Sequence, residues 1–100
     1  MLIIKNEDIA SAILAVSSGH RHLRLAISTT EGETIVLQEA TVAAIVRAYT
    51  AIKTHPTRKA VKLVSALPEG VKKGYAKNQL MEVDSSDEDV VTEMTELIFK

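Results

Sequence analysis

HLRLAISTTEGETIVLQ, residues 22–38, is the stretch that decides the fold. Aliphatic side chains occupy every second position of residues 23–28, which is the period of a strand with one apolar face. Residues 29–32 (TTEG) have the composition of a turn, and residues 34–38 (TIVLQ) are again rich in β-branched side chains. We therefore predict an antiparallel β-hairpin over this stretch.

Two further elements are predicted before the hairpin. Residues 2–4 (LII) form a short apolar, β-branched run that is typical of a strand. In residues 6–19, Asn6 precedes two acidic residues, as at a helix N-terminus, and Gly19 suits a helix end. The apolar residues between them recur at the i, i+3, i+4, i+7 spacing of a helix: Ile9, Ala12, Ile13 and Val16. We therefore predict a helix here.

The chain after the hairpin alternates between clear and ambiguous patterns. Residues 40–54 have a helical apolar stripe that His55-Pro56 ends, because the residue before proline avoids helical backbone angles. Residues 57–67 fit both the helical period and the alternation of a strand, and we favour the helix. Residues 68–77, with two glycines and a proline, read as a loop or an irregular helical turn.

The last part of the chain predicts a strand over residues 79–83 and then a helix. Ser85 and Glu88 have the spacing of a capping box, and the neighbouring acids suit a helix start. The helix would bury a stripe made of Val90, Val91, Met94, Leu97 and Ile98.

Together these elements predict an α+β protein with a single small domain, residues 1–100. Their order, βαββ(αα)βα, indicates a ferredoxin-like antiparallel sheet with helices packed on one face. The order over residues 6–83 is similar to that of type II KH domains, which bind RNA through a Gly-x-x-Gly loop between two helices. The matching junction, residues 53–58, holds no glycine, and the hairpin strands lack the base-stacking aromatics of RRM domains. No family is assigned on these patterns.

Composition excludes several classes of chemistry. The chain has no cysteine, so disulfides, thiol catalysis and cysteine-ligated metals are ruled out. No apolar stretch approaches the roughly 20 residues that span a bilayer, and the start lacks the pattern of a signal peptide. We therefore expect a cytoplasmic protein with no membrane partner and no cofactor. No catalytic motif is present, so a non-catalytic role is favoured over an enzyme.

Charge is sorted along the second half of the chain. Residues 51–80 carry seven basic side chains against one acidic, and residues 81–100 carry the reverse. The acids are explained by the start of the last helix, whereas no local structural need explains the bases. The interpretation we favour is an exposed basic face that the acidic last helix balances within the same domain. The alternative is an anion site, because basic side chains beside a helix start or a glycine-containing loop are suited to hold anions. The candidate anion-binding residues are Arg58, Lys59, Lys62, Lys72, Lys73 and Lys77.

The histidines add a set of secondary candidates. His20 and His22 share a strand face, as a pair of metal ligands would, but a third ligand is missing and neighbouring arginines would repel a cation. We therefore predict no metal site. His20, His22, Arg24 and His55 are instead secondary candidates for an anion site.

The functional prediction is association. We expect a small association module, an accessory subunit or self-assembling protein of a larger complex, because the charged segments are complementary and both hairpin faces carry apolar residues. Ile35 and Leu37 lie on one face and Val36 on the other. A protein partner or a homo-oligomer is expected. The alternative is binding of an anion, a nucleotide or an RNA backbone by residues 53–77, and nucleic acid is not the favoured partner.

Overall fold

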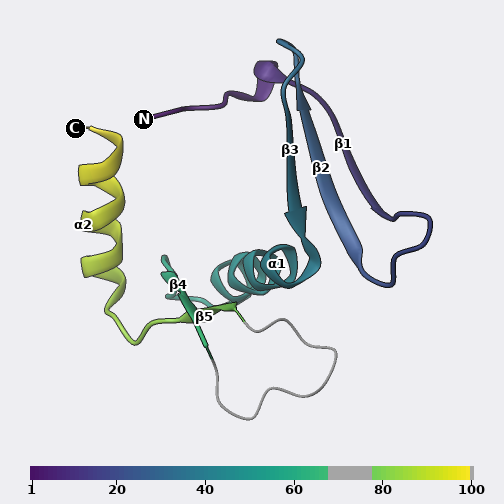
Figure 1. The fold of residues 1–100 in the computed structure, drawn as a ribbon. Coiled ribbons are helices and arrows are strands. Elements are labelled where there is room, and N and C mark those ends of the chain that lie inside the picture. The colour runs from purple at the N-terminus through teal and green to yellow at the C-terminus, as the bar shows by residue number, and fades with distance from the viewer. Residues whose placement is uncertain (68–77, 100) are drawn as a thin grey trace. The chain divides into compact units, whose positions relative to one another are not determined.

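The computed structural model describes residues 1–67 and 78–99 and has an α+β fold (Figure 1). Its elements in chain order are η1 (Asn6–Asp8), β1 (Ile9–Val16), β2 (Leu23–Thr29), β3 (Thr34–Gln38), α1 (Glu39–Thr54), β4 (Leu63–Ala66), β5 (Gln79–Glu82) and α2 (Asp87–Ile98). The loop or helical turn predicted for residues 68–77 lies outside the described residues. No described helix is long and apolar enough to cross a membrane.

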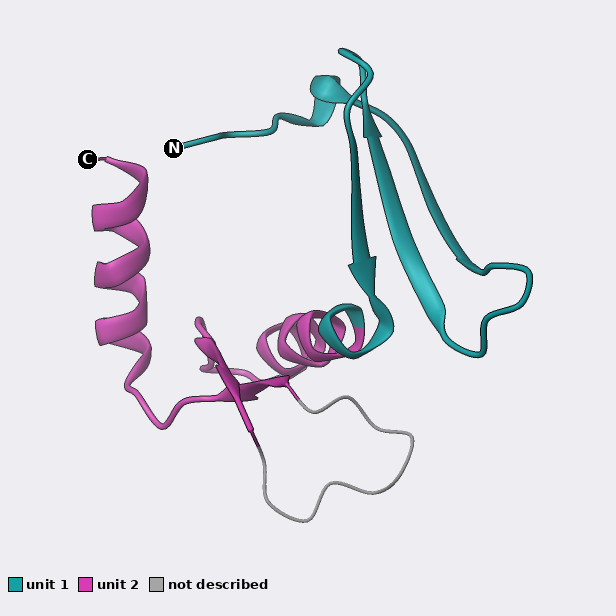
Figure 2. Cartoon of the chain, in the orientation of Figure 1, with its two compact units in different colours: residues 1–42 teal, residues 43–100 magenta. Residues whose placement is uncertain are grey.

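The chain divides into two compact units, residues 1–42 and 43–100, which Figure 2 colours separately. The first unit contains the sheet β1–β2–β3, and the second contains β4, β5 and α2. Helix α1 begins in the first unit and continues into the second. The expectation of a single domain stays a prediction.

The first unit is an antiparallel sheet of three strands in the order β1-β2-β3. The predicted hairpin is confirmed as β2 and β3, with Leu25 opposite Leu37 and Ile27 opposite Ile35. Its turn depends on Gly32, whose φ of 93° lies in the left-handed region that favours glycine. The turn is closed by the Thr29 N–H, which donates to the Glu33 carbonyl at 2.8 Å.

The helix predicted over residues 6–19 is wrong. Only Asn6–Asp8 form a single 3₁₀ turn, and the residues with helical spacing lie instead in strand β1. Strand β1 pairs with β2 along its whole length, with one irregularity between Ile9 and Ser11. This cross-strand pairing takes up the backbone hydrogen bonds on one side of β1, and it suits the β-branched side chains at Ile9, Ile13 and Val16.

The strand predicted for residues 2–4 is also absent, because these residues belong to no sheet and their side chains are exposed. A strand needs a neighbour to take up its backbone hydrogen bonds, and none pairs with this run among the described residues. An apolar, β-branched composition was therefore not sufficient to predict a strand at residues 2–4.

The second unit contains a separate two-stranded sheet. Strand β4 pairs antiparallel with β5, with Leu63 opposite Glu82 and Ala66 opposite Gln79. The helix favoured for residues 57–67 is therefore wrong, and the alternation in the same stretch had indicated the strand that forms. The strand predicted for residues 79–83 is confirmed as β5.

Both predicted long helices form. Helix α1 ends at Thr54, just before His55-Pro56. Helix α2 begins one residue later than the predicted capping box implies, because Ser86 is its N-cap and the Ser86 Oγ accepts from the Asp89 N–H at 3.2 Å. Ser85 instead donates its backbone N–H to the carbonyl of Val83.

The element order differs from the predicted ferredoxin-like arrangement. That arrangement places four strands in one sheet, whereas the described strands form one sheet of three and one of two. The difference follows from residues 9–16, which are a strand instead of the first helix. Among the described residues, the buried side chains are those of Val42 and Ala44, both on α1.

Candidate interaction surfaces

One face of the β1–β2–β3 sheet carries aliphatic side chains, with Thr29 at the end of β2 as its polar exception. Residues directly opposite one another in an antiparallel sheet project to the same side, so the register defines the rows of each face. One row is Leu14, Leu25 and Leu37, and the next is Ala12, Ile27 and Ile35. We call this surface the apolar face; its members are Ala12, Leu14, Val16, Leu23, Leu25, Ile27, Ile35 and Leu37.

The opposite face, which we call the mixed face, has an apolar row at its centre. That row is Ile13, Ala26 and Val36. It is bordered by a row with Ser28 and Thr34, whose hydroxyls lie 3.2 Å apart, and by a row that includes Arg24. Apolar side chains therefore lie on both sides of the sheet.

Neither face of this sheet is buried. The side chains of β2, the middle strand, are half-buried, and the edge strand β1 is much more open. Ile13 and Leu14, on opposite faces, are each 59% exposed, and Val36 on β3 is 56% exposed. The edge strand β1 therefore has apolar side chains on both faces that the described residues leave exposed to solvent.

Strand β1 is also an open edge. The sheet order leaves one side of β1 and one side of β3 without a partner strand among the described residues. The sequence interpretation missed this feature because it placed residues 9–16 in a helix. The signal that could have found it is that residues 9–16 (IASAILAV) are apolar except for Ser11 and end at a glycine-containing turn, a continuous run that fits a strand as well as a helix.

Helix α2 has an apolar stripe that is exposed instead of buried. The sequence predicted this stripe as part of the core, yet Val91, Met94, Leu97 and Ile98 are all exposed and only Val90 is half-buried. The amphipathic pattern correctly indicated a helix. The pattern did not show what covers that stripe, and no described residue does so.

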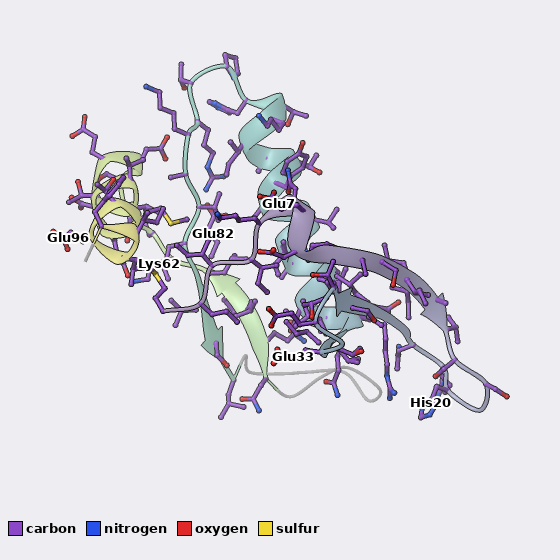
Figure 3. The ribbon with its side chains drawn as sticks, turned by 90° about the horizontal axis from the view of Figure 1, so that it is seen from above. Glu7, His20, Glu33, Lys62, Glu82 and Glu96 are labelled. Carbon is purple, nitrogen blue, oxygen red and sulfur yellow. The ribbon has the colours of Figure 1, made fainter. Side chains whose placement is uncertain are left out.

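The described part of the predicted anion site is largely engaged with carboxylates. Arg58 forms an ion pair with Glu82 on β5. The Lys62 ammonium donates to both carboxylate oxygens of Glu93, at 2.8 and 2.9 Å, and Figure 3 shows its position near α2. Lys59 is exposed, and its backbone N–H donates to the Asp87 carboxylate at 2.7 Å.

All three predicted residues therefore contact acidic side chains, Arg58 and Lys62 through their charged groups and Lys59 through its backbone N–H. The acidic helix that the sequence assigned to capping also neutralises Lys62, and β5 neutralises Arg58. A charge paired in this way attracts an additional anion less than a free one does. Lys72, Lys73 and Lys77 lie outside the described residues, so their part of the site stays a prediction.

The secondary candidates lie in separate places. His20, in the β1–β2 turn, is labelled in Figure 3, and its Nδ1 lies 3.4 Å from the Arg24 guanidinium. The Nδ1 of His22 lies 3.1 Å from the Glu39 carboxylate, whose other oxygen accepts from the Leu23 N–H at 3.4 Å. The Nδ1 of His55 accepts from the Thr57 N–H, also within its own loop. Each histidine therefore has a local structural contact.

Metal binding gains no support from these positions. Within residues 1–67 and 78–99, no group of three histidine or acidic side chains lies close enough together to hold an ion.

Comparison with known proteins adds no relative. The chain matches no protein-family model, no curated protein and no solved structure. The functional argument therefore depends on the surfaces described above.

Proposed function

We propose that the chain is a small non-catalytic association module that assembles with itself or docks as a subunit onto a larger protein. The observation that carries the proposal is the exposure of apolar side chains on both faces of one sheet. Ile13 and Leu14 are neighbours in sequence, point to opposite sides of β1, and are each 59% exposed. Contiguous exposed apolar surface of this kind is typical of protein–protein interfaces.

The energetics require a partner that covers more than β1 alone. Covering the exposed half of one aliphatic side chain contributes about 1 kcal/mol. Ile13, Leu14 and Val16 of one chain would therefore contribute about 3 kcal/mol, or about 6 kcal/mol when a second copy buries the same residues, which leaves little or no net gain against the roughly 4–15 kcal/mol lost when two molecules associate. The interface must therefore also include other residues of the apolar face or new backbone hydrogen bonds.

Binding of an anion, a nucleotide or an RNA backbone remains the alternative prediction. The contacts of residues 58–62 weigh against it, because Arg58 and Lys62 already pair with Glu82 and Glu93. The same contacts change the expected mode of association. Complementary charged segments would give assembly that salt weakens, whereas an apolar interface gives assembly that persists in salt.

Sedimentation equilibrium of the full chain tests the proposal. We expect the mean mass to rise above that of one chain between micromolar and millimolar concentration, at low and at high salt, and to be unchanged by added RNA. A strict monomer over this range, together with no binding to an immobilised larger protein complex from the same source, would refute association. Binding of RNA that falls steeply with salt and is lost when Lys72 and Lys73 become Glu would support the alternative.

A further inference from the structure

The open edge of β1 has the properties of a strand that pairs with another strand. It is eight residues long, IASAILAV, and contains neither a charged residue nor a proline. Natural sheets usually protect an open edge with charges, prolines or very short strands, because unpaired backbone groups are a template for a further strand. Strand β1 has none of these three protections, and its one irregularity, between Ile9 and Ser11, leaves residues 11–16 in regular pairing.

The other open edge is better protected. Strand β3 has only five residues and lies between Glu33 and Glu39. Glu39 contacts His22 and the Leu23 N–H at the start of β2, so its carboxylate lies on the β2 side, and the shortness of β3 is the main protection of this edge. The contrast between the two edges selects β1 as the one that takes a partner.

A second copy of the same strand is the occupant that β1 suits. In a twofold pair each residue meets the same surface of the other chain, so any charge on the edge would face a like charge nearby. An uncharged edge avoids this repulsion. A twofold pair is also closed, so it consumes the open edge of both chains without forming a fibre.

The register follows from parity. Two residues that lie directly opposite each other in an antiparallel pair project to the same face of the sheet. Successive residues of a strand project to opposite faces. Opposite residues in a twofold pair of β1 must therefore both have odd numbers or both have even numbers, so that the two numbers add to an even sum. Placing Ile13 opposite the second Ile13 sets Ala12 against Leu14 and Ser11 against Ala15. If the twofold axis lay at Ala12 instead, the paired residues would extend to Asp8, and the Asp8 carboxylate would lie against the end of the partner strand.

We propose that two copies pair antiparallel through the outer edges of β1, with the twofold axis at Ile13, to form one six-stranded sheet. This inference rests on the proposed association function and names its interface. The row Ile13, Ala26 and Val36 then continues into the same row of the second chain. On the apolar face the small Ala12 meets the large Leu14, so the two apolar faces join into one surface.

Cysteine cross-linking tests the interface, because the natural chain has no cysteine and every thiol would be an introduced one. Directly opposite residues have Cβ atoms about 5 Å apart, within reach of mild oxidation or a short bis-maleimide linker. We expect Ile13→Cys to cross-link to itself. Val36→Cys is the matched control, since Val36 lies in the same row, is similarly exposed and is on the other edge.

A mixing experiment tests the register. Ser11→Cys and Ala15→Cys should each fail to cross-link alone, because each residue lies about 13 Å from its own copy, four residues along the strand. An equal mixture of the two variants should cross-link between chains. Self-linking of either variant alone, without linking in the mixture, would overturn the proposed register.

Sedimentation of lysine variants separates this inference from the broader proposal. Ile13→Lys should give a monomer, while Val36→Lys should associate like the natural chain; circular dichroism checks that both fold. Two results would refute the β1 pairing while association stands. In the first, Ile13→Lys associates as the natural chain does. In the second, Val36→Cys cross-links and Ile13→Cys does not. If the natural chain is a strict monomer, the β1 pairing is refuted, and association stands only if the chain binds a larger protein complex from the same source.

Discussion

The ammonium of Lys62 donates to both carboxylate oxygens of Glu93, at 2.8 and 2.9 Å, across 31 positions of sequence. This contact joins the residue before β4 to the middle of α2. Together with the Arg58–Glu82 pair, it brings basic residues of the 51–80 segment against acidic residues of the 81–100 segment inside one unit. The sorted charges therefore act, in part, within the chain.

Replacing Lys62 by Met should lower the free energy of unfolding by about 0.5 kcal/mol, because both partners are partly exposed and such pairs are weak. Methionine keeps the aliphatic stem, so the change removes mainly the charge. Urea denaturation at low salt measures the effect, which should shrink at high salt. Lys59→Met is the control, because the Lys59 ammonium has no ion pair among the described residues; an equal loss there would contradict this account.

Replacing Ser86 by Ala should destabilise the start of α2 by about 1 kcal/mol, since the Asp89 N–H would lose its acceptor. Far-ultraviolet circular dichroism and amide exchange at Asp89 measure this change. Ser85→Ala tests the alternative cap that the sequence spacing predicted. A larger effect from Ser85 than from Ser86 would show that the helix begins one residue earlier.

Replacing Glu39 by Ala should loosen the entry to β2, because one carboxylate accepts from Leu23 and contacts His22. A hydrogen bond of this kind contributes about 1 kcal/mol, so amide exchange at Leu23 should accelerate several-fold. Glu33→Ala, at the other end of β3, is the control and should leave that amide unchanged. Equal exchange rates in both variants would show that Glu39 does not hold the strand.

The parts of the fold that sequence predicted correctly are those with local signals. The hairpin over 22–38 combines alternation with a glycine that takes a positive φ. Helix α1 combines a long apolar stripe with His55-Pro56 at its end, and α2 combines a stripe with a serine cap. In each case the information lies within about 17 consecutive residues, which is the range that periodicity can detect.

The wrong predictions concern segments whose sequences fit both the helical and the strand period. In these segments, pairing with another strand distant in sequence determines the structure. Residues 9–16 satisfy the helical spacing through Ile9 and Ile13, yet the same residues pair with β2 over the whole strand. Residues 63–66 are decided in the same way by β5, which follows 13 positions later in the chain. Pairing with β2 and with β5 therefore decides these two segments, because their sequences fit both periods.

The candidate site was only partly visible in the sequence. The apolar character of Ile35, Val36 and Leu37 on two faces indicated a surface that needs cover, and the register confirms which residues share each face. The open edge at β1 could not be predicted once Ile13 was placed in a helix. The anion site predicted for the basic residues stays a prediction, and the pairing of Lys62 with Glu93 could not be assigned from sequence because it depends on tertiary contacts.

The central claim is that a second copy of the chain contacts the exposed apolar side chains of β1, and a mixed-label NMR sample tests it most directly. Isotope-labelled and unlabelled chains are mixed in equal amounts, and contacts between different chains are recorded selectively. We predict contacts between chains from the methyl groups of Ile13, Leu14 and Val16, and none from Ile45 on α1, which is also exposed. If those β1 methyl groups contact only their own chain at millimolar concentration, the claim is contradicted.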